Sequence, residues 1–286
     1  MKIVQPIFIL GSGRSGTTIL YDLLAVHPDV CWFSSLMNNH PNHPSAGFLN
    51  RAVDIPVLGN NIKQAIIQKL PPYFIHPSEG ENIYINCGFR DDQKLLKHAD
   101  WQSGKLKKII ASHLWLTGKK RFLAKRTANT QRLAILKATF PDAYYIHIIR
   151  DGRAVSSSLL HSPWWENVPI WWLNGETPHQ WRQEGKEPIE LCALHWQRNV
   201  KEIKKNCNKL NTTYMEMRYE DLAADVLGSL RRILTFCNLP IPETYINNLP
   251  SHLINMNNKW KNTLTNHQKI ILQNTIGPFA YKLGYK

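Results

Sequence analysis

The segment "GSGRSGTT", residues 11–18, directly follows the apolar run "PIFIL" and precedes "ILYDLLAVHP", whose apolar residues have helical spacing. A buried strand, a loop of small residues and a helix in this order are typical of a phosphate-binding loop. The spacing G-x-x-x-x-G is kept from Gly11 to Gly16, but Thr17 stands where such loops carry lysine. The segment therefore predicts an oxyanion-binding loop for which a nucleoside triphosphate with Mg²⁺ is a poor ligand.

Side chains within this loop also favour an anion. Arg14 places a guanidinium group beside the bound group, where it can pair with two oxygens. Thr17 and Thr18 add two hydroxyl donors at the start of the following helix. The alternative is a plain Gly/Ser turn between a strand and a helix, which we disfavour because strand, loop and helix occur in the required order.

A second strand-to-helix junction lies in "YYIHIIRDGRAVSSSLL", residues 144–160. Arg150 ends the predicted strand, and Arg153 adds a positive charge nearby. Ser158 is eight residues on, about two turns into the helix, and helical side chains lean towards the N-terminus. Arg150 and Ser158 therefore predict a second, smaller anion site, with a solvated turn as an equal alternative.

Alternating strands and helices predict an α/β fold. We expect strands at 3–10, 30–33, 121–125, 144–149 and 212–219, and mostly helix over 36–120. The expected architecture is a P-loop-type three-layer fold. A mostly parallel central sheet is flanked by helices, with a helical insertion at about 36–118, in one domain over 1–286. In such sheets ligands bind at the carboxyl ends of the strands.

The composition limits the kinds of binding partner and the cellular compartment that can be expected. A formal net charge of +14 favours an anionic partner, but the basic residues are not interleaved with aromatics in one segment, which disfavours nucleic acid. The five cysteines are scattered, so neither a zinc site nor a redox motif is indicated. No run approaches the roughly 20 apolar residues of a membrane span. We expect a cytoplasmic protein without a resident metal.

Several segments together resemble the sulfotransferases that use 3′-phosphoadenosine 5′-phosphosulfate. They are "RSGTT" after a strand, "AKRTANTQRLAILKATFPDAYYIHIIRD", "IIRDGRAVSSSL", "RYEDLAADVLGSLRRILTFCNLP", "KWKNTLT" and the terminal "GYK". The resemblance covers most of the chain in pieces, and residues 36–118 and 161–190 lie outside it. It implies that the anionic ligand is this phosphosulfate nucleotide and that no metal is needed.

The resemblance also implies roles for residues of both anion sites. The 3′-phosphate would be bound by Arg150 and Ser158, and Tyr219 would lie by the adenine, although a plain core aromatic is equally open there. The residues that would bind the phosphosulfate are Gly13, Arg14, Ser15, Gly16, Thr17 and Thr18.

For catalysis, the resemblance points to positive charge at the leaving phosphate. Arg14 occupies the basic loop position of the family, and Lys125 matches the lysine of its K-T-P-x-N stretch. Asn129 and Arg132 match the same stretch, whereas Thr127 stands where proline is usual.

The sequence indicates the general base less clearly than the nucleotide-binding residues. The cytosolic phenol and steroid branch keeps a histidine two residues after the lysine, where this chain has Thr127. Together with Arg14, this favours the bacterial, tyrosine-protein and glycan branches. We choose Glu79 as the base, with a solvated loop carboxylate as its alternative. The other candidates are His40, His43 and His113, the last of which lies on an apolar helix face.

The acceptor is an unidentified small molecule, glycan or peptide with a hydroxyl or amine. Five tryptophans between residues 164 and 181 could either pack the core or form part of the acceptor site. The alternative function is a P-loop nucleotide or small-molecule kinase, disfavoured by Thr17 at the lysine position. The oligomeric state stays open.

Overall fold

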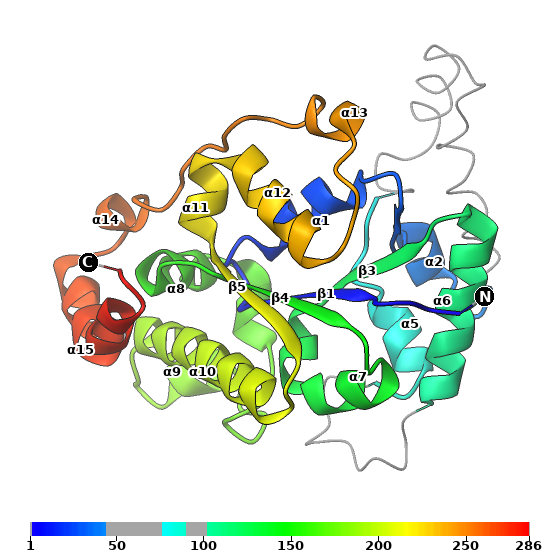
Figure 1. Ribbon diagram of the computed structural model, residues 1–286. Helices are drawn as coiled ribbons and strands as arrows, with labels where there is room; N and C mark the ends of the chain where they lie inside the picture. Colours follow the sequence, from blue (N-terminus) through cyan, green and yellow to red (C-terminus); the bar gives the residue numbers. More distant parts are fainter. Residues whose placement is uncertain (1, 44–75, 90–101, 286) are drawn as a thin grey trace, which may run out of the picture. The chain divides into compact units, whose positions relative to one another are not determined.

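The computed structural model describes residues 2–43, 76–89 and 102–285 (Figure 1). In this part of the chain, a five-stranded sheet has the order β2-β3-β1-β4-β5. The strands are β1 Ile7–Leu10, β2 Val30–Cys31, β3 Arg121–Lys125, β4 Tyr144–Ile149 and β5 Thr213–Arg218. β3 pairs in parallel with both β1 and β2. The predicted α/β fold with a mostly parallel sheet flanked by helices is confirmed.

The helices alternate with these strands, as predicted. They are α1 Thr17–Ala25, α2 Ser35–Asn39, α5 Glu81–Asn86, α6 Ser103–Thr117, α7 Leu133–Thr139, α8 Gly152–Leu160, α9 Pro178–Gln183, α10 Pro188–Lys209, α11 Tyr219–Ala224, α12 Val226–Phe236, α13 Glu243–Ile246, α14 Trp260–Thr263 and α15 Asn266–Lys282. Two 3₁₀ helices, η3 Thr127–Gln131 and η4 Pro163–Asn167, follow β3 and α8.

The strand predictions differ from the structure only at their ends. Both β3 and β4 have the predicted bounds. β1 begins later, at Ile7, because Pro6 lacks an amide hydrogen and Gln5 has a positive φ of 45°. β2 ends at Cys31, two residues before the predicted end.

The predicted helical insertion at about 36–118 is described in part. α5 and α6 and most of α2 lie within it, whereas residues 44–75 and 90–101 are outside the described residues. In α6 the apolar face that carries His113 is buried, and Gly118 ends the helix in the left-handed conformation with φ 69°.

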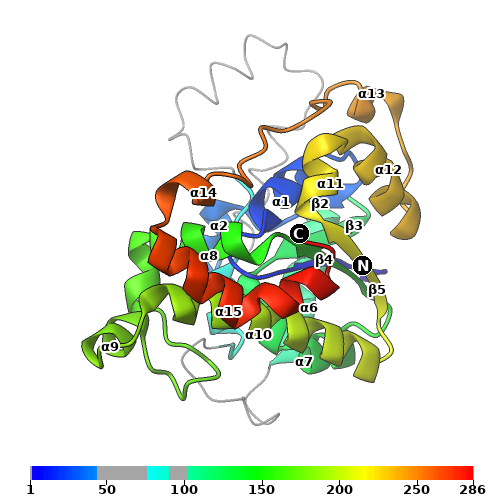
Figure 2. The ribbon, with the colours of Figure 1, turned by 90° about the vertical axis from the view of Figure 1, so that its left-hand side faces the viewer.

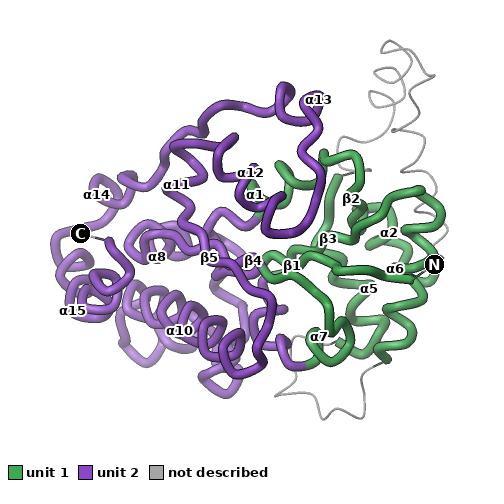
Figure 3. The backbone as a smooth tube through the Cα atoms, in the orientation of Figure 1, with its two compact units in different colours: residues 1–9, 18–126, 135–145 green, residues 10–17, 127–134, 146–286 purple. Residues whose placement is uncertain are grey.

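The chain divides into two compact units, each built from several stretches of sequence (Figure 3). Unit 1 comprises residues 1–9, 18–126 and 135–145, and unit 2 comprises 10–17, 127–134 and 146–286. The prediction of a single domain over 1–286 stays a prediction.

Each unit has its own buried aromatic side chains. In unit 1, Phe33 packs against Phe122 and Tyr84. In unit 2, α8, α10 and α15 lie side by side (Figures 1 and 2) around a cluster that includes Trp165 and Trp196. No helix among the described residues has the length and apolar character needed to cross a membrane.

Candidate functional site

The loop between β1 and α1 is tightly folded against Tyr219 of α11. Gly16 has φ +90°, and a Cβ at this position would lie 2.4 Å from Cδ2 of Tyr219. Only glycine combines that backbone conformation with so close an approach. The Tyr219 ring is buried and packs against Gly16. The predicted position of Tyr219 beside the adenine stays a prediction.

Arg14 joins the two predicted anion sites. Its backbone is in the left-handed region with φ 67°, which is uncommon for a residue with a side chain. Its exposed side chain reaches α8, where Nε donates a hydrogen bond to Ser158 Oγ at 2.8 Å. The strained backbone therefore accompanies a contact between residues 144 positions apart in the sequence.

Arg150, at the end of β4, lies beside the same loop. One terminal nitrogen of its guanidinium group donates to the Arg14 carbonyl oxygen at 3.1 Å, and Nε donates to Asn257 Oδ1 at 2.7 Å. The guanidinium carbon lies 4.5 Å from the centre of the Tyr219 ring, in a cation–π arrangement. Burial lowers the pKa of Arg150 from its ordinary value, while Tyr219 and Glu220 oppose this effect.

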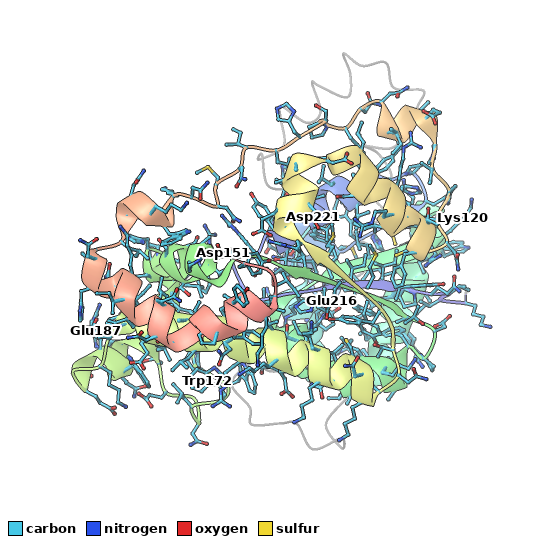
Figure 4. All side chains as sticks on the ribbon, turned by 60° about the vertical axis from the view of Figure 1, so that its left-hand side comes forward. Lys120, Asp151, Trp172, Glu187, Glu216 and Asp221 are labelled. Atoms are coloured by element: carbon cyan, nitrogen blue, oxygen red, sulfur yellow. The ribbon has the colours of Figure 1, made fainter. Side chains whose placement is uncertain are left out.

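Arg153, which was expected to add positive charge near Arg150, forms an ion pair with Asp151. Asp151, labelled in Figure 4, is the N-cap of α8 and accepts hydrogen bonds from the backbone and the side chain of Arg153. The Arg153 Nη2 and Asp151 Oδ2 atoms are 2.8 Å apart, and the guanidinium group lies over the Trp260 ring. The charge of Arg153 is therefore compensated by a carboxylate two residues away.

Four buried polar side chains lie in the two loops that follow β1 and β3. They are Ser12, Ser15, Asn129 and Thr130. In the described part of the chain, their hydroxyl and amide groups have no hydrogen-bond partner. Because β1 and β3 are parallel neighbours, these loops follow the same edge of the sheet. Buried polar groups are normally hydrogen-bonded, so this edge is suited to a ligand rich in acceptors and donors.

In unit 1, the structure brings together two residues predicted for catalysis. Lys125, the last residue of β3, donates a hydrogen bond from Nζ to Oε1 of Glu79. The Lys125 side chain is 8% exposed and that of Glu79 is 40% exposed. A buried ammonium group thus has a carboxylate partner that solvent can reach.

Sequence reasoning missed Asp22, a second carboxylate of this unit. Burial raises the pKa of Asp22, and electrostatic interactions with His76 and Lys125 oppose that rise. Asp22 is four residues after Thr18 in α1, which places both on one face of the helix.

The three histidines that compete with Glu79 as bases have different environments. His40 and His43 are exposed, close to the end of α2. His113 is buried in α6, where Nε2 lies 2.8 Å from the Trp32 carbonyl oxygen. Burial lowers the pKa of His113 to about 4. His113 therefore has the environment of a core histidine.

The tryptophan-rich segment packs mainly into unit 2. Trp165, Trp172 and Trp181 belong to its apolar cluster or pack against it, and Trp171 donates a hydrogen bond to Asn199 Oδ1. Trp164 differs, since it is half exposed. A Cβ at Gly13 would lie 3.6 Å from its ring, so Trp164 lies beside the loop that is predicted to bind the first anion.

The sequence of this chain is similar to those of known sulfotransferases. The sequence model of the sulfotransferase family matches residues 6–243. The omega-hydroxy-beta-dihydromenaquinone-9 sulfotransferase Stf3 of Mycobacterium bovis is 24% identical over 98% of this chain and 75% of its own length.

Solved structures share the fold. Sulfotransferase STF9 of Mycobacterium avium has a TM-score of 0.59 at 15% identity, over 99% of this chain and 77% of its own. The sulfotransferase domain of the curacin biosynthetic pathway has a TM-score of 0.55 at 15% identity, over 100% of this chain and 99% of its own.

Proposed function

The chain belongs to the sulfotransferase family and transfers a sulfuryl group, and from this premise we propose that its donor is 3′-phosphoadenosine 5′-phosphosulfate. The observation that carries the proposal is the convergence of Arg14, Ser158 and Arg150. Arg14 bonds to Ser158, and Arg150 bonds to the backbone of Arg14. Two cations and a hydroxyl are thus within reach of a ligand with more than one anionic group.

The loop residues then hold the 5′-phosphosulfate without a metal. Gly13, Ser15 and Gly16 let the backbone pass close to the ligand, and the Ser15 hydroxyl is buried without a partner in the described structure. Thr17 and Thr18 add hydroxyl donors at the N-terminus of α1, where unpaired N–H groups and the helix dipole favour an anion. Arg150 and Ser158 hold the 3′-phosphate.

The donor supplies an activated sulfuryl group, whose bond to the phosphate oxygen breaks as the bond to the acceptor oxygen forms. Arg14 and Lys125 are the side chains that we assign to the negative charge on the departing phosphate. Glu79 is the base that takes the acceptor's proton. Each of these roles is a proposal that rests on the family resemblance and on the contacts described above.

For the acceptor, we propose the hydroxyl group of a small molecule. The Mycobacterium bovis relative is named as acting on a hydroxylated dihydromenaquinone, and Trp164 presents a half-exposed ring beside Gly13. An apolar or ring-bearing acceptor fits such a surface. An amine, a glycan or a peptide acceptor, and a cytoplasmic location, stay predictions.

One titration tests the donor. Calorimetry should show binding of 3′-phosphoadenosine 5′-phosphate that EDTA leaves unchanged, and weaker binding of ATP with Mg²⁺ and of an oligonucleotide. Tighter binding of ATP–Mg²⁺ would favour the kinase alternative. Radiolabelled donor, incubated with a panel of hydroxylated isoprenoids, phenols, sugars and peptides, then identifies the acceptor class by the product that carries the label.

A further inference from the structure

Glu220, the second residue of α11, accepts hydrogen bonds from three separate segments of unit 2. Its Oε1 accepts from the backbone N–H of Asp151 at 3.0 Å and from Nδ2 of Asn257. Its Oε2 accepts from the hydroxyl of Tyr285 at 3.2 Å. One carboxylate therefore ties the end of β4, the segment before α14 and the C-terminal residues together.

Asn257 connects this carboxylate to Arg150. The Asn257 amide is buried, donates through Nδ2 to Glu220 and accepts through Oδ1 from Arg150 Nε at 2.7 Å. A carboxylate can only accept and a guanidinium group can only donate. The two neighbours therefore allow one orientation of the amide, in which Oδ1 faces Arg150.

We propose that Glu220 is a positioning residue, which orients the Arg150 guanidinium group for the 3′-phosphate through the amide of Asn257. This inference rests on the proposed function, which assigns Arg150 to that phosphate. Three contacts on Arg150, from Asn257, from the Arg14 carbonyl oxygen and from the Tyr219 ring, restrict the plane of the guanidinium group. The second terminal nitrogen has no partner among the described residues.

Tyr285 extends the same arrangement to the end of the chain. Its ring is buried and lies 4.4 Å from the guanidinium carbon of Arg218, and its hydroxyl bonds to Glu220. The C-terminal segment thus reaches Glu220, and through it the proposed nucleotide site. Loss of the Tyr285 hydroxyl should loosen Glu220, and with it the orientation of Asn257 and Arg150.

The test measures discrimination rather than affinity alone. Calorimetry with 3′-phosphoadenosine 5′-phosphate and with adenosine 5′-phosphate gives the ratio of the two dissociation constants for each variant. Asn257→Ala should reduce this ratio by roughly tenfold, the order of one hydrogen bond to a charged group. Tyr285→Phe, which keeps the buried ring, should reduce it less, by about threefold, because two of the three donors to Glu220 remain.

Matched controls separate positioning from stability. Asn258→Ala changes the exposed neighbour of Asn257, and Tyr281→Phe removes a hydroxyl from an exposed tyrosine of α15. Both should keep the wild-type ratio. Glu216→Gln, on β5 (Figure 4), removes a carboxylate that pairs with Lys204 and Tyr214 instead, and it should also keep the ratio.

The outcomes are distinct. A reduced ratio in Asn257→Ala and Tyr285→Phe, with control ratios unchanged, supports the inference. Equal weakening of both ligands in these two variants would show a purely structural role and overturn it, as would wild-type ratios. If the wild-type protein itself does not distinguish the two nucleotides, then the assignment of Arg150 in the proposed function is wrong.

Discussion

Lys125 and Glu79 are 46 residues apart in the sequence, and their side chains form an ion pair that combines a buried ammonium group with a half-exposed carboxylate. The sequence made both residues candidates for catalysis. Lys125 was expected to stabilise negative charge on the leaving phosphate, and Glu79 was expected to take the acceptor's proton. Their contact means that substitution of either residue changes the surroundings of the other. Steady-state constants for a Lys125 variant and the pH–rate profile of a Glu79 variant therefore report on two separate roles.

Lys125→Ala should lower kcat on the order of 10²–10³, by analogy with removal of one oxyanion donor. The reason is that its charge matters most when negative charge has developed on the leaving oxygen. KM for the donor should change little. Steady-state kinetics with an acceptor identified by screening give both values. The control is Lys120→Ala, which replaces an exposed lysine directly before β3. A rise in KM at constant kcat would assign Lys125 to binding alone.

Glu79→Gln should abolish the loss of rate at low pH. A base must be ionised to accept the proton, so the wild-type rate falls as pH falls, and a variant without that base lacks this limb. The pH–rate profile checks it, with Glu81→Gln in the first turn of α5 as the matched control. A wild-type rate and profile in Glu79→Gln would eliminate Glu79 and leave Asp22, His40 and His43 for the same test.

Thr17→Ala and Thr18→Ala should weaken nucleotide binding and lower the rate together. Each hydroxyl is assigned a hydrogen bond to the phosphosulfate in the ground state and in the transition state. Its removal should therefore destabilise both states by about 1.5–3 kcal/mol, the free energy of a hydrogen bond to a charged group. Calorimetry and kinetics on the same preparations compare the two losses. An unchanged affinity for 3′-phosphoadenosine 5′-phosphate in both variants would contradict the assignment of this helix start to the ligand.

Gly16→Ala should abolish nucleotide binding, because its Cβ would lie 2.4 Å from the Tyr219 ring at a φ of +90°. Gly118→Ala is the matched control, since Gly118 also has a positive φ, 69°, with no atom within 4 Å of a Cβ. The control should lose stability, on the order of 1 kcal/mol from backbone strain, and keep its affinity. Equal affinities in the two variants would count against a tight loop.

The buried His113 should make stability fall in acid. Its pKa is about 4 in the folded protein, because of burial, and about 6.5 in the unfolded chain. Between these values the unfolded chain binds more protons, so the free energy of unfolding falls as pH falls from about 6.5 to 4. His113→Gln, which can still donate to the Trp32 carbonyl oxygen, should reduce this dependence but not abolish it, because burial also lowers the pKa values of His147 and His195. Urea unfolding at several pH values measures it, and His252→Gln, an exposed histidine, should leave it unchanged.

The sequence by itself determined the strand, loop and helix at residues 7–25 and the bounds of β3 and β4. The helical repeat also predicted that Ser158 faces back towards the end of its strand, and in the structure the Ser158 hydroxyl accepts a hydrogen bond from Arg14. These features follow from short-range rules: apolar periodicity, the need for glycine in tight loops, and the 3.6-residue repeat of a helix. These rules depend only on residues that are close together in the sequence, so one amino-acid sequence is enough to predict such features.

Only the tertiary structure decided the partners. Nothing local indicates that Glu79 pairs with Lys125 or that Asn257 orients Arg150 across 107 residues. Arg153 was expected to add charge to an anion site, yet Asp151 compensates that charge. Polar side chains choose among many possible partners, and burial and the packing of distant segments determine which one lies within hydrogen-bond distance.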